Sequence, residues 1–258
     1  PCLKDLQEIS FNVPFSVVSP LVFNNQDFDL HGSDSLVFIM EKNLGSLGRI
    51  IKKTSFYGNT FVVDHGYYLK DGGLNNLSVV WSGGLKATEK NISEELTYSQ
   101  AFVAQNKNIE SISLTPDGVS DKVDGVSLSG KTDWVGIRNK YFINSLISNS
   151  ASGGAVSGAS FQLNDKTFIP QYSMSLDFEN SSIIQVRQYL GPLDVDLIEQ
   201  SGTYLDRVMN FGWLPIQPFS RSVLWVLKTL RLVGFNYGVI LILFAFLIRL
   251  LTGPLTKK

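Results

Sequence analysis

The residues of this chain that could do chemistry are few and widely spaced. Its two histidines, His31 and His65, lie in Asp-Leu-His-Gly and Asp-His-Gly contexts that are typical of turns. General acid–base catalysis needs such a group within hydrogen-bond reach of a substrate, and neither histidine belongs to a recognisable catalytic motif. A solvated or structural role is therefore the favoured interpretation for both.

Other chemical signatures are weak. The single cysteine, Cys2, excludes an intrachain disulfide and a cysteine-based metal site. Asp117, Asp121 and Asp124 resemble part of a calcium loop, but the remaining ligands and the glycine placement do not fit. The sequence contains no P-loop, dinucleotide-type glycine pattern or nucleophile elbow. We therefore expect no enzymatic activity, no metal and no cofactor.

A further charged group, Arg249, interrupts an apolar stretch at residues 234–255, GFNYGVILILFAFLIRLLTGPL. Backbone polar groups in hydrocarbon must be satisfied within the segment, so this stretch predicts a transmembrane helix. An arginine there is costly unless it snorkels to the headgroups or lines a hydrated cavity. Lys257 and Lys258 follow, as positive residues do on the cytoplasmic side. From the residues alone, snorkelling is slightly favoured.

The segment before this stretch has the spacing of an amphipathic helix. Residues 219–233 place apolar side chains on one stripe and basic side chains on the opposite side. This pattern predicts a helix that lies in a membrane interface, and an ordinary helix docked on a soluble domain is the alternative. The residues that we expect to anchor it are Trp213, Phe219, Val223, Trp225, Val226 and Leu230.

The chain before residue 191 has the patterns of a soluble β domain. Apolar and polar residues alternate with period two, which predicts strands with one buried face, at residues 111–115, 126–129, 172–178 and 183–190. Apolar runs at residues 36–40, 60–63 and 77–81 predict strands buried on both faces. Frequent turn signals indicate an antiparallel sandwich. Residues 148–158, rich in Ser, Gly and Ala, predict a mobile loop.

Composition agrees with this division. The 22 basic and 23 acidic residues give a net charge of −1, so no basic face for nucleic acid is expected.

Residues 193–208 have helical spacing that Gly202 weakens, so this helix is expected to be broken in two. We predict a β domain at 1–191, a helical linker at 192–212, the interfacial helix at 213–233 and a transmembrane helix at 234–258. The chain starts with Pro1 and reads as a piece of a longer protein.

From Trp134 to its end, the chain resembles the YidC branch of the YidC/Oxa membrane protein insertases. The motifs that carry the resemblance are WVGIRNKYF at 134–142, YLGPLD at 189–194, FGWL at 211–214 and the segment 238–257. The resemblance implies a mainly β, antiparallel β-super-sandwich in the periplasm, followed by an interfacial helix and the first helix of a membrane core. It also places Arg249 in the hydrophilic groove that receives incoming polypeptide, which favours the cavity interpretation of this arginine.

The sequence thus predicts a non-enzymatic membrane protein insertase and chaperone of the bacterial inner membrane, with its large N-terminal domain in the periplasm. The resemblance implies nascent membrane proteins, Sec translocon components and the lipid bilayer as partners. A carbohydrate-binding or scaffolding periplasmic domain with a membrane anchor is the alternative, because the super-sandwich also resembles sugar-binding domains. The other core helices of the family are missing from this chain, so we do not expect it to insert proteins by itself.

Overall fold

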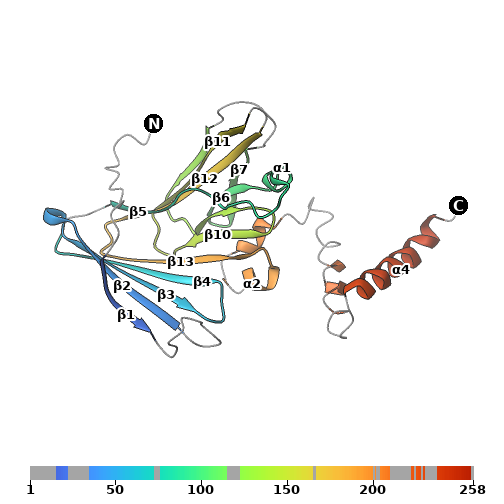
Figure 1. Ribbon diagram of the computed structural model, residues 1–258, viewed down its shortest axis with the longest axis horizontal. Coiled ribbons are helices and arrows are strands. Elements are labelled where there is room, and N and C mark those ends of the chain that lie inside the picture. The colour runs from blue at the N-terminus through green and yellow to red at the C-terminus, as the bar shows by residue number, and fades with distance from the viewer. Residues whose placement is uncertain are drawn as a thin grey trace. The chain divides into compact units, whose positions relative to one another are not determined.

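The computed structural model divides the chain into two compact units, Pro1–Asp206 and Arg207–Lys258 (Figure 1). The structure describes residues 16–22, 35–72, 76–114, 123–164, 167–199, 201, 204–209, 222–223, 225–227, 229 and 237–256. The first unit is built from two antiparallel sheets. The prediction of a mainly β, antiparallel fold is therefore confirmed.

Over the described residues, the larger sheet has nine strands in the order β1-β2-β3-β4-β13-β10-β9-β6-β7. Every neighbouring pair is antiparallel. Its strands are β1 (Ser16–Val22), β2 (Ser35–Asn43), β3 (Arg49–Tyr57), β4 (Val62–Lys70), β6 (Gln100–Gln105), β7 (Asn108–Ile112), β9 (Trp134–Arg138), β10 (Phe142–Ile147) and β13 (Ile183–Pro192). The late strand β13 therefore joins the β1–β4 meander to the remaining strands.

The smaller sheet, counted in the same part of the chain, has four strands in the order β5-β12-β11-β8. They are β5 (Asn76–Trp81), β8 (Val123–Ser129), β11 (Gly153–Asn164) and β12 (Thr167–Glu179). The helices with stated bounds are α1 (Ile92–Leu96), α2 (Val195–Glu199) and α4 (Tyr237–Thr256), with 3-10 turns η1 (Gly45–Leu47) and η2 (Leu205–Val208). Residues 222–223, 225–227 and 229 are also helical.

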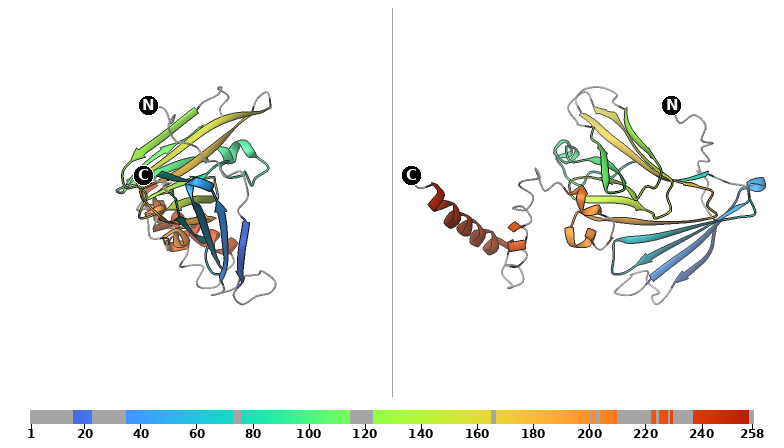
Figure 2. Two further views of the ribbon diagram at one scale, coloured as in Figure 1. Left: turned by 90° about the vertical axis from the view of Figure 1, so that its left-hand side faces the viewer. Right: turned by 180° about the vertical axis from the view of Figure 1, so that it is seen from behind.

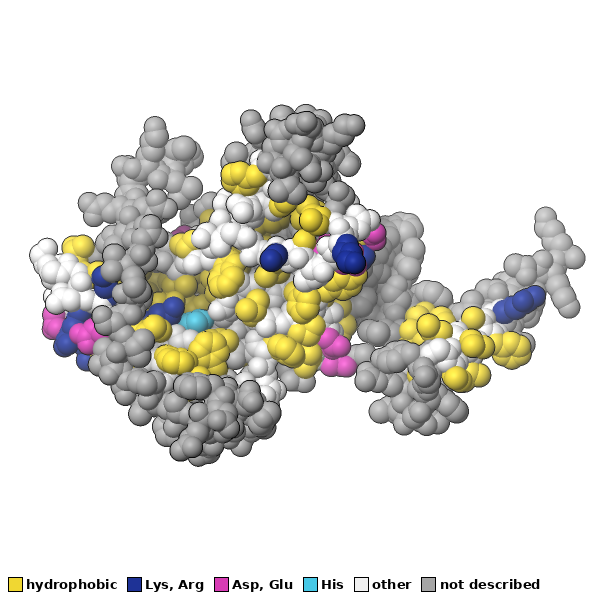
Figure 3. Space-filling model, in the orientation of Figure 1, with side chains coloured by type: hydrophobic (Ala, Val, Ile, Leu, Met, Phe, Trp, Pro, Cys, Tyr) yellow, Lys and Arg dark blue, Asp and Glu magenta, His cyan; other side chains and the backbone are white. Residues whose placement is uncertain are grey.

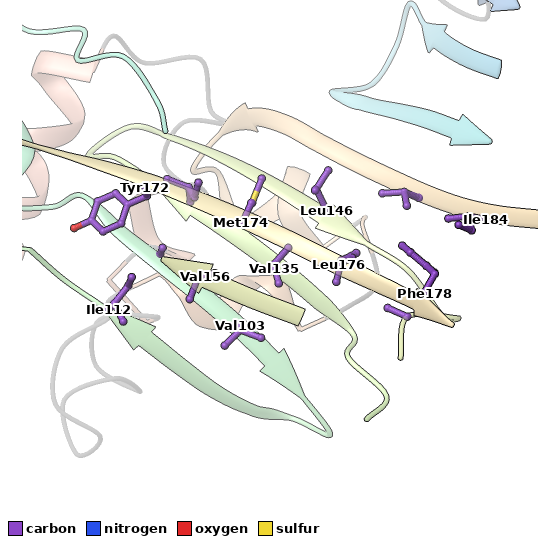
Figure 4. Close-up of a cluster of buried hydrophobic side chains, with 14 of the residues drawn as sticks. Val103, Ile112, Val135, Leu146, Val156, Tyr172, Met174, Leu176, Phe178 and Ile184 are labelled. Atoms are coloured by element: carbon purple, nitrogen blue, oxygen red, sulfur yellow. The ribbon is translucent and has the colours of Figure 1, made fainter. Parts of the chain in front are cut away.

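The hydrophobic core lies between the two sheets (Figure 4). Strand β12 contributes Tyr172, Met174, Leu176 and Phe178, each at most 2% exposed, which confirms the alternation read from the sequence. These side chains pack with residues of the larger sheet such as Val135. Full burial of a large apolar side chain stabilises a fold by roughly 1.5–3 kcal/mol, so this stripe fixes the register of the sandwich.

The smaller sheet covers only part of the larger one. Strands β11 and β12 pack against β6 and β9, and β11 also packs against β7. Strands β2, β3 and β4 extend away from the smaller sheet (Figures 1 and 2). Among the described strands, none forms a second layer over this part of the inward-looking face of the larger sheet.

The glycine-rich stretch after β10 differs from the prediction. Strand β11 begins at Gly153, so the predicted loop is wrong over residues 153–158. A Cβ on Gly154 would lie 2.6 Å from the Thr132 side chain, and one on Gly158 would lie 2.7 Å from the Tyr172 ring. The small residues allow close packing within the sandwich. Composition alone does not separate this use of glycine from chain flexibility.

Some predicted strands are more exposed than their apolar residues suggested. Residues 77–81 lie in β5, at the edge of the smaller sheet, and Val80 is 60% exposed, so the prediction of burial on both faces is wrong. Residues 60–61 precede β4, which begins at Val62. Leu190 in β13 is 42% exposed although the preceding apolar residues of its face are buried. A short apolar run does not distinguish a central strand from an edge strand.

The predicted helix at 193–208 is broken, as expected, into α2 and η2. The Asp194 carboxylate accepts a hydrogen bond from the backbone N–H of Asp196 at 2.9 Å, so it caps the start of α2. Ile198 is fully buried, which attaches this helix to the β domain. Among the residues that the structure describes, no helix is long and apolar enough to cross a membrane.

Candidate functional site

Arg249, the predicted groove residue, lies in α4 and its side chain is exposed. Several bulky apolar side chains on the same helix are 41–71% exposed, namely Val239, Leu241, Ile242, Leu243 and Phe246. Figure 3 shows hydrophobic side chains gathered over the described part of α4. A helix that presents apolar side chains on most sides is typical of one embedded in an apolar environment.

The residues predicted to anchor an interfacial helix are only partly described. Trp213, Phe219 and Leu230 lie outside the described residues. Val223, Trp225 and Val226 are helical, and the two valines are half-buried whereas the indole of Trp225 is 68% exposed. The Thr229 hydroxyl donates to the carbonyl of Trp225 at 2.8 Å. The anchoring role of these residues stays a prediction.

His65 lies on β4 and is half-buried, whereas His31 lies outside the described residues. The hydroxyl oxygen of Thr54 lies 3.2 Å from Nδ1 of His65, and the amide oxygen of Gln188 lies 3.0 Å from Nε2 of the same ring. Because an amide oxygen only accepts, Nε2 carries the proton and Nδ1 accepts from the hydroxyl. Burial lowers the pKa of His65, which favours the neutral ring. This arrangement supports the structural role expected from the sequence.

The hydrogen bonds of His65 belong to a polar row that the sequence did not reveal. The Gln188 amide donates to Oδ1 of Asn144 at 2.8 Å. The row therefore crosses β3, β4, β13 and β10, and it joins residues 123 positions apart in the chain. Its last member, Asn144, is fully buried, and its Nδ2 has no hydrogen-bond partner within the described residues. Only knowledge of the strand order could have brought these residues together.

Lys52 and Tyr67 lie beside this row on the same face. Tyr67 is the register partner of Lys52 on β3 and of the buried Ile184 on β13, so its ring looks towards the smaller sheet. The Lys52 ammonium lies over this ring, 5.4 Å from its centroid. Burial lowers the pKa of Lys52 and raises that of Tyr67 to about 12. The face thus combines a neutral histidine with a partly desolvated cation.

The opposite face of the same strands has a polar hollow of about 600 Å³. Among its lining residues, Asp64 accepts hydrogen bonds from Tyr57 at 3.0 Å and from Arg187 at 3.4 Å. Ser148, whose hydroxyl donates to the Gln185 carbonyl, lines its rim. Since its acid and its arginine neutralise each other, this hollow does not resemble a catalytic centre.

The sequence motif at residues 134–142 contributes Asn139 to a buried polar junction. Glu95, at the end of α1, is fully buried and accepts hydrogen bonds from the backbone N–H groups of Thr88 and Glu89 at 2.6 and 2.7 Å. The side-chain amide of Asn139 donates to the same carboxylate at 2.8 Å, and its oxygen accepts from the N–H of Phe142. Asn139 therefore joins the β9–β10 turn to the segment before α1, so its role is structural.

No metal site is formed by the described residues, where three or more histidine, cysteine or acidic side chains never converge. Asp124 is exposed on β8. Asp117, Asp121 and Cys2 lie outside the described residues. The described part of the chain is thus a β module whose polar side chains mainly hold its strands and turns together, in a protein that also contains an apolar helix.

Comparison with known proteins assigns this module. Residues 15–226 match the family model described as the YidC periplasmic domain. The chain therefore belongs to the YidC family of membrane protein insertases, which are not enzymes. The family and the non-enzymatic class predicted from the sequence are both confirmed.

Individual relatives agree with this assignment. The membrane protein insertase YidC of Chloroherpeton thalassium is 30% identical over 249 residues, which cover 90% of this chain and 41% of that protein. The protein of the same name from Chlorobium luteolum is 33% identical over 216 residues, covering 78% of this chain and 36% of the relative. The chain thus spans about two fifths of the length of the curated relatives it matches.

A weaker likeness connects the chain with a solved structure. The galactose mutarotase related enzyme from Lactobacillus acidophilus has a TM-score of 0.34 and 8% sequence identity, with coverage of 66% of this chain and 70% of that chain. At this level the likeness carries no argument about fold or function.

Proposed function

We propose that this chain is the periplasmic domain and first core helix of an insertase and chaperone that assists the insertion and folding of bacterial inner-membrane proteins. The match of residues 15–226 to the YidC periplasmic domain carries this proposal. Its partners are nascent membrane proteins and, for part of its substrates, components of the Sec translocon. Its N-terminal domain, a β-super-sandwich, lies in the periplasm.

The membrane architecture of the proposal rests on the C-terminal unit. The described residues of α4 do not by themselves form a membrane-spanning helix, so the proposal relies on the apolar stretch 234–255 of the sequence. As a helix at about 1.5 Å per residue, this stretch reaches the roughly 30 Å thickness of a hydrocarbon core. The outward-facing apolar side chains of α4 lose unfavourable contact with water on entering lipid. The exposed indole of Trp225 suits the headgroup region. Residues 213–233 accordingly lie in the interface and residues 234–255 cross the bilayer.

The mechanism is assisted partitioning. A guanidinium remains charged in nearly every protein environment, so Arg249 supplies a fixed positive charge at membrane depth. In the groove that the whole protein forms, this charge attracts acidic groups of an incoming segment. The attraction is stronger than in water because the surroundings have a lower dielectric constant. The cost of bringing the polar flanks of a substrate into the bilayer is thereby lowered.

Substitution of Arg249 in the complete protein tests this function. Arg249→Ala should abolish insertion of a single-spanning substrate with an acidic translocated segment, whereas Arg249→Lys should retain most of it. The surface variant Arg187→Ala controls for the loss of an arginine elsewhere. Wild-type insertion by Arg249→Ala would reject the mechanism. For the alternative function, binding of a sugar to the chain in a calorimetric titration would favour a carbohydrate-binding domain.

A further inference from the structure

The inward-looking face of β2, β3 and β4 carries apolar, polar and charged side chains. Its members share one face of the sheet because they are register partners, Phe38 with Thr54, Thr54 with His65, Met40 with Lys52 and Lys52 with Tyr67. We call this set the open inner surface, defined by the half-buried residues Phe38, Met40, Lys52, His65 and Tyr67. Tyr67 lies at the edge of the core, where it packs against buried residues. Among the described strands, the main contacts of the smaller sheet with the larger one are with β6, β7 and β9 and not with β2 and β3.

Within the part of the chain that the structure describes, no carboxylate is paired with the charge of Lys52 on this surface. The ammonium of Lys52 lies over the face of the Tyr67 ring, and burial lowers its pKa. A partly buried charge without an ionic partner is unfavourable, and an opposite charge would relieve that cost. On the other face of the same strands, by contrast, Asp64 and Arg187 already form a pair.

The surroundings of Lys52 are preorganised. His65 is held by Thr54 on one side and Gln188 on the other, so both of its ring nitrogens are engaged. The neutral imidazole leaves Lys52 as the cation of this surface. A rigid, singly charged site fits a single anionic group better than a cluster of charges.

Apolar side chains flank the cation on the β2 side. The rings of Phe38 and Phe56 meet edge to face, with centroids 6.0 Å apart. Phe38 and Met40 are half-buried, and Phe56 is 37% exposed. A ligand that fits this surface therefore carries apolar groups close to its anion, which describes an extended polypeptide better than a free inorganic ion.

We propose that the open inner surface binds an extended polypeptide segment, with Lys52 pairing with an Asp or Glu carboxylate and Phe38, Met40 and Phe56 contacting apolar side chains beside it. This binding gives the periplasmic domain a holding activity for translocated segments. It is separate from the proposed action of Arg249, because it needs neither a membrane groove nor insertion. An experiment can therefore disprove binding by the open inner surface without disproving the action of Arg249, and the reverse also holds.

A pair of matched variants tests the proposal, since Lys52 and Lys53 are adjacent in sequence but lie on opposite faces of β3. The probe is a short fluorescein-labelled peptide of alternating leucine, serine and phenylalanine with a central aspartate, compared with its asparagine twin. Fluorescence anisotropy with the full chain in detergent micelles measures both affinities. An added charge-assisted hydrogen bond predicts about tenfold tighter binding of the aspartate peptide.

Lys52→Met should remove this preference while keeping the apolar stem, and Lys53→Met should leave it unchanged. Equal affinity of the wild-type chain for the two peptides would overturn the proposal, as would a preference that survives in Lys52→Met. Loss of the preference in both variants would indicate diffuse attraction and overturn it as well.

A second measurement does not depend on the folding of a variant. Reductive ¹³C-methylation followed by NMR reports the pKa of Lys52 in the wild-type chain. Addition of the aspartate peptide should raise that lowered pKa, because the carboxylate favours the charged amine. An unchanged pKa at saturating peptide would contradict direct pairing.

Discussion

Glu95 shows how a single residue organises the segment next to β9 and β10. Its two carboxylate oxygens each accept two hydrogen bonds, Oε2 from the N–H groups of Thr88 and Glu89, and Oε1 from the Thr88 hydroxyl and Asn139. Water does not reach this carboxylate, since the residue is fully buried. The junction therefore depends on an acceptor that offers four lone pairs and no hydrogen.

Glu95→Gln should destabilise the fold because the new amide nitrogen would face two donors. Leaving buried donors unsatisfied costs roughly 1–3 kcal/mol each, and urea denaturation followed by circular dichroism measures the loss. The neighbouring Glu94→Gln is the control, because that side chain forms an exposed ion pair with Lys140. Equal effects of the two substitutions would show that Glu95 does not hold the junction.

His65 should make the stability of the fold depend on pH. Burial is the largest cause that lowers its pKa, so below about pH 6.5 the unfolded chain takes up a proton more readily than the native one. The free energy of unfolding should therefore fall as pH decreases through 6.5 towards the lowered native value. His65→Gln should flatten this part of the profile, which urea midpoints at several pH values would measure. An identical slope in variant and wild type would rule out His65 as the source.

At this scale the sequence predicted the character of single residues better than their partners. The turn predicted around His65 is wrong, because this residue lies inside β4. The structural role expected for it agrees with its two hydrogen bonds. Its hydrogen bond to Gln188 spans 123 positions, and no local pattern contains that pairing. Lys52 gave no signal either, because a lysine within an apolar strand also occurs on solvated faces.

At the scale of elements, period-two alternation was the most reliable signal. It identified the core face of β12 residue by residue, since Tyr172, Met174, Leu176 and Phe178 are all buried. It failed where small residues replaced large ones. In β11, glycine occupies positions that face the core, so the strand lacks the apolar side chains on which the alternation depends.

Gly158→Ala tests the packing explanation of β11. The added Cβ would lie 2.7 Å from the Tyr172 ring and 2.9 Å from the Leu114 side chain, in a closed core. Overpacking of this kind costs typically about 1–3 kcal/mol, which thermal or urea unfolding would detect. Ser157→Ala, at the exposed neighbouring position, should change stability little. A neutral Gly158→Ala would show that the strand does not require glycine there.

At the scale of the whole molecule, the chain combines two units that distribute their large apolar side chains in opposite ways. The first unit buries its large apolar side chains between two sheets, as a water-exposed domain does. The second unit contains a helix with the opposite distribution, in which large apolar side chains face outward. On the function proposed above, the two units belong together, because the apolar helix would attach the periplasmic domain to the membrane.

This contrast predicts how the chain partitions between membrane and water. Ile242 is 71% exposed on α4, and an arginine at the centre of a transmembrane helix costs about 2.5–3.5 kcal/mol on the insertion scale. Ile242→Arg should therefore lower the fraction of the chain that stays with membranes during alkaline carbonate extraction. Val80→Arg introduces the same group at an exposed apolar position of β5 and should not alter that fraction. If both variants remained fully membrane-bound, α4 would not be the segment that holds the chain in the bilayer.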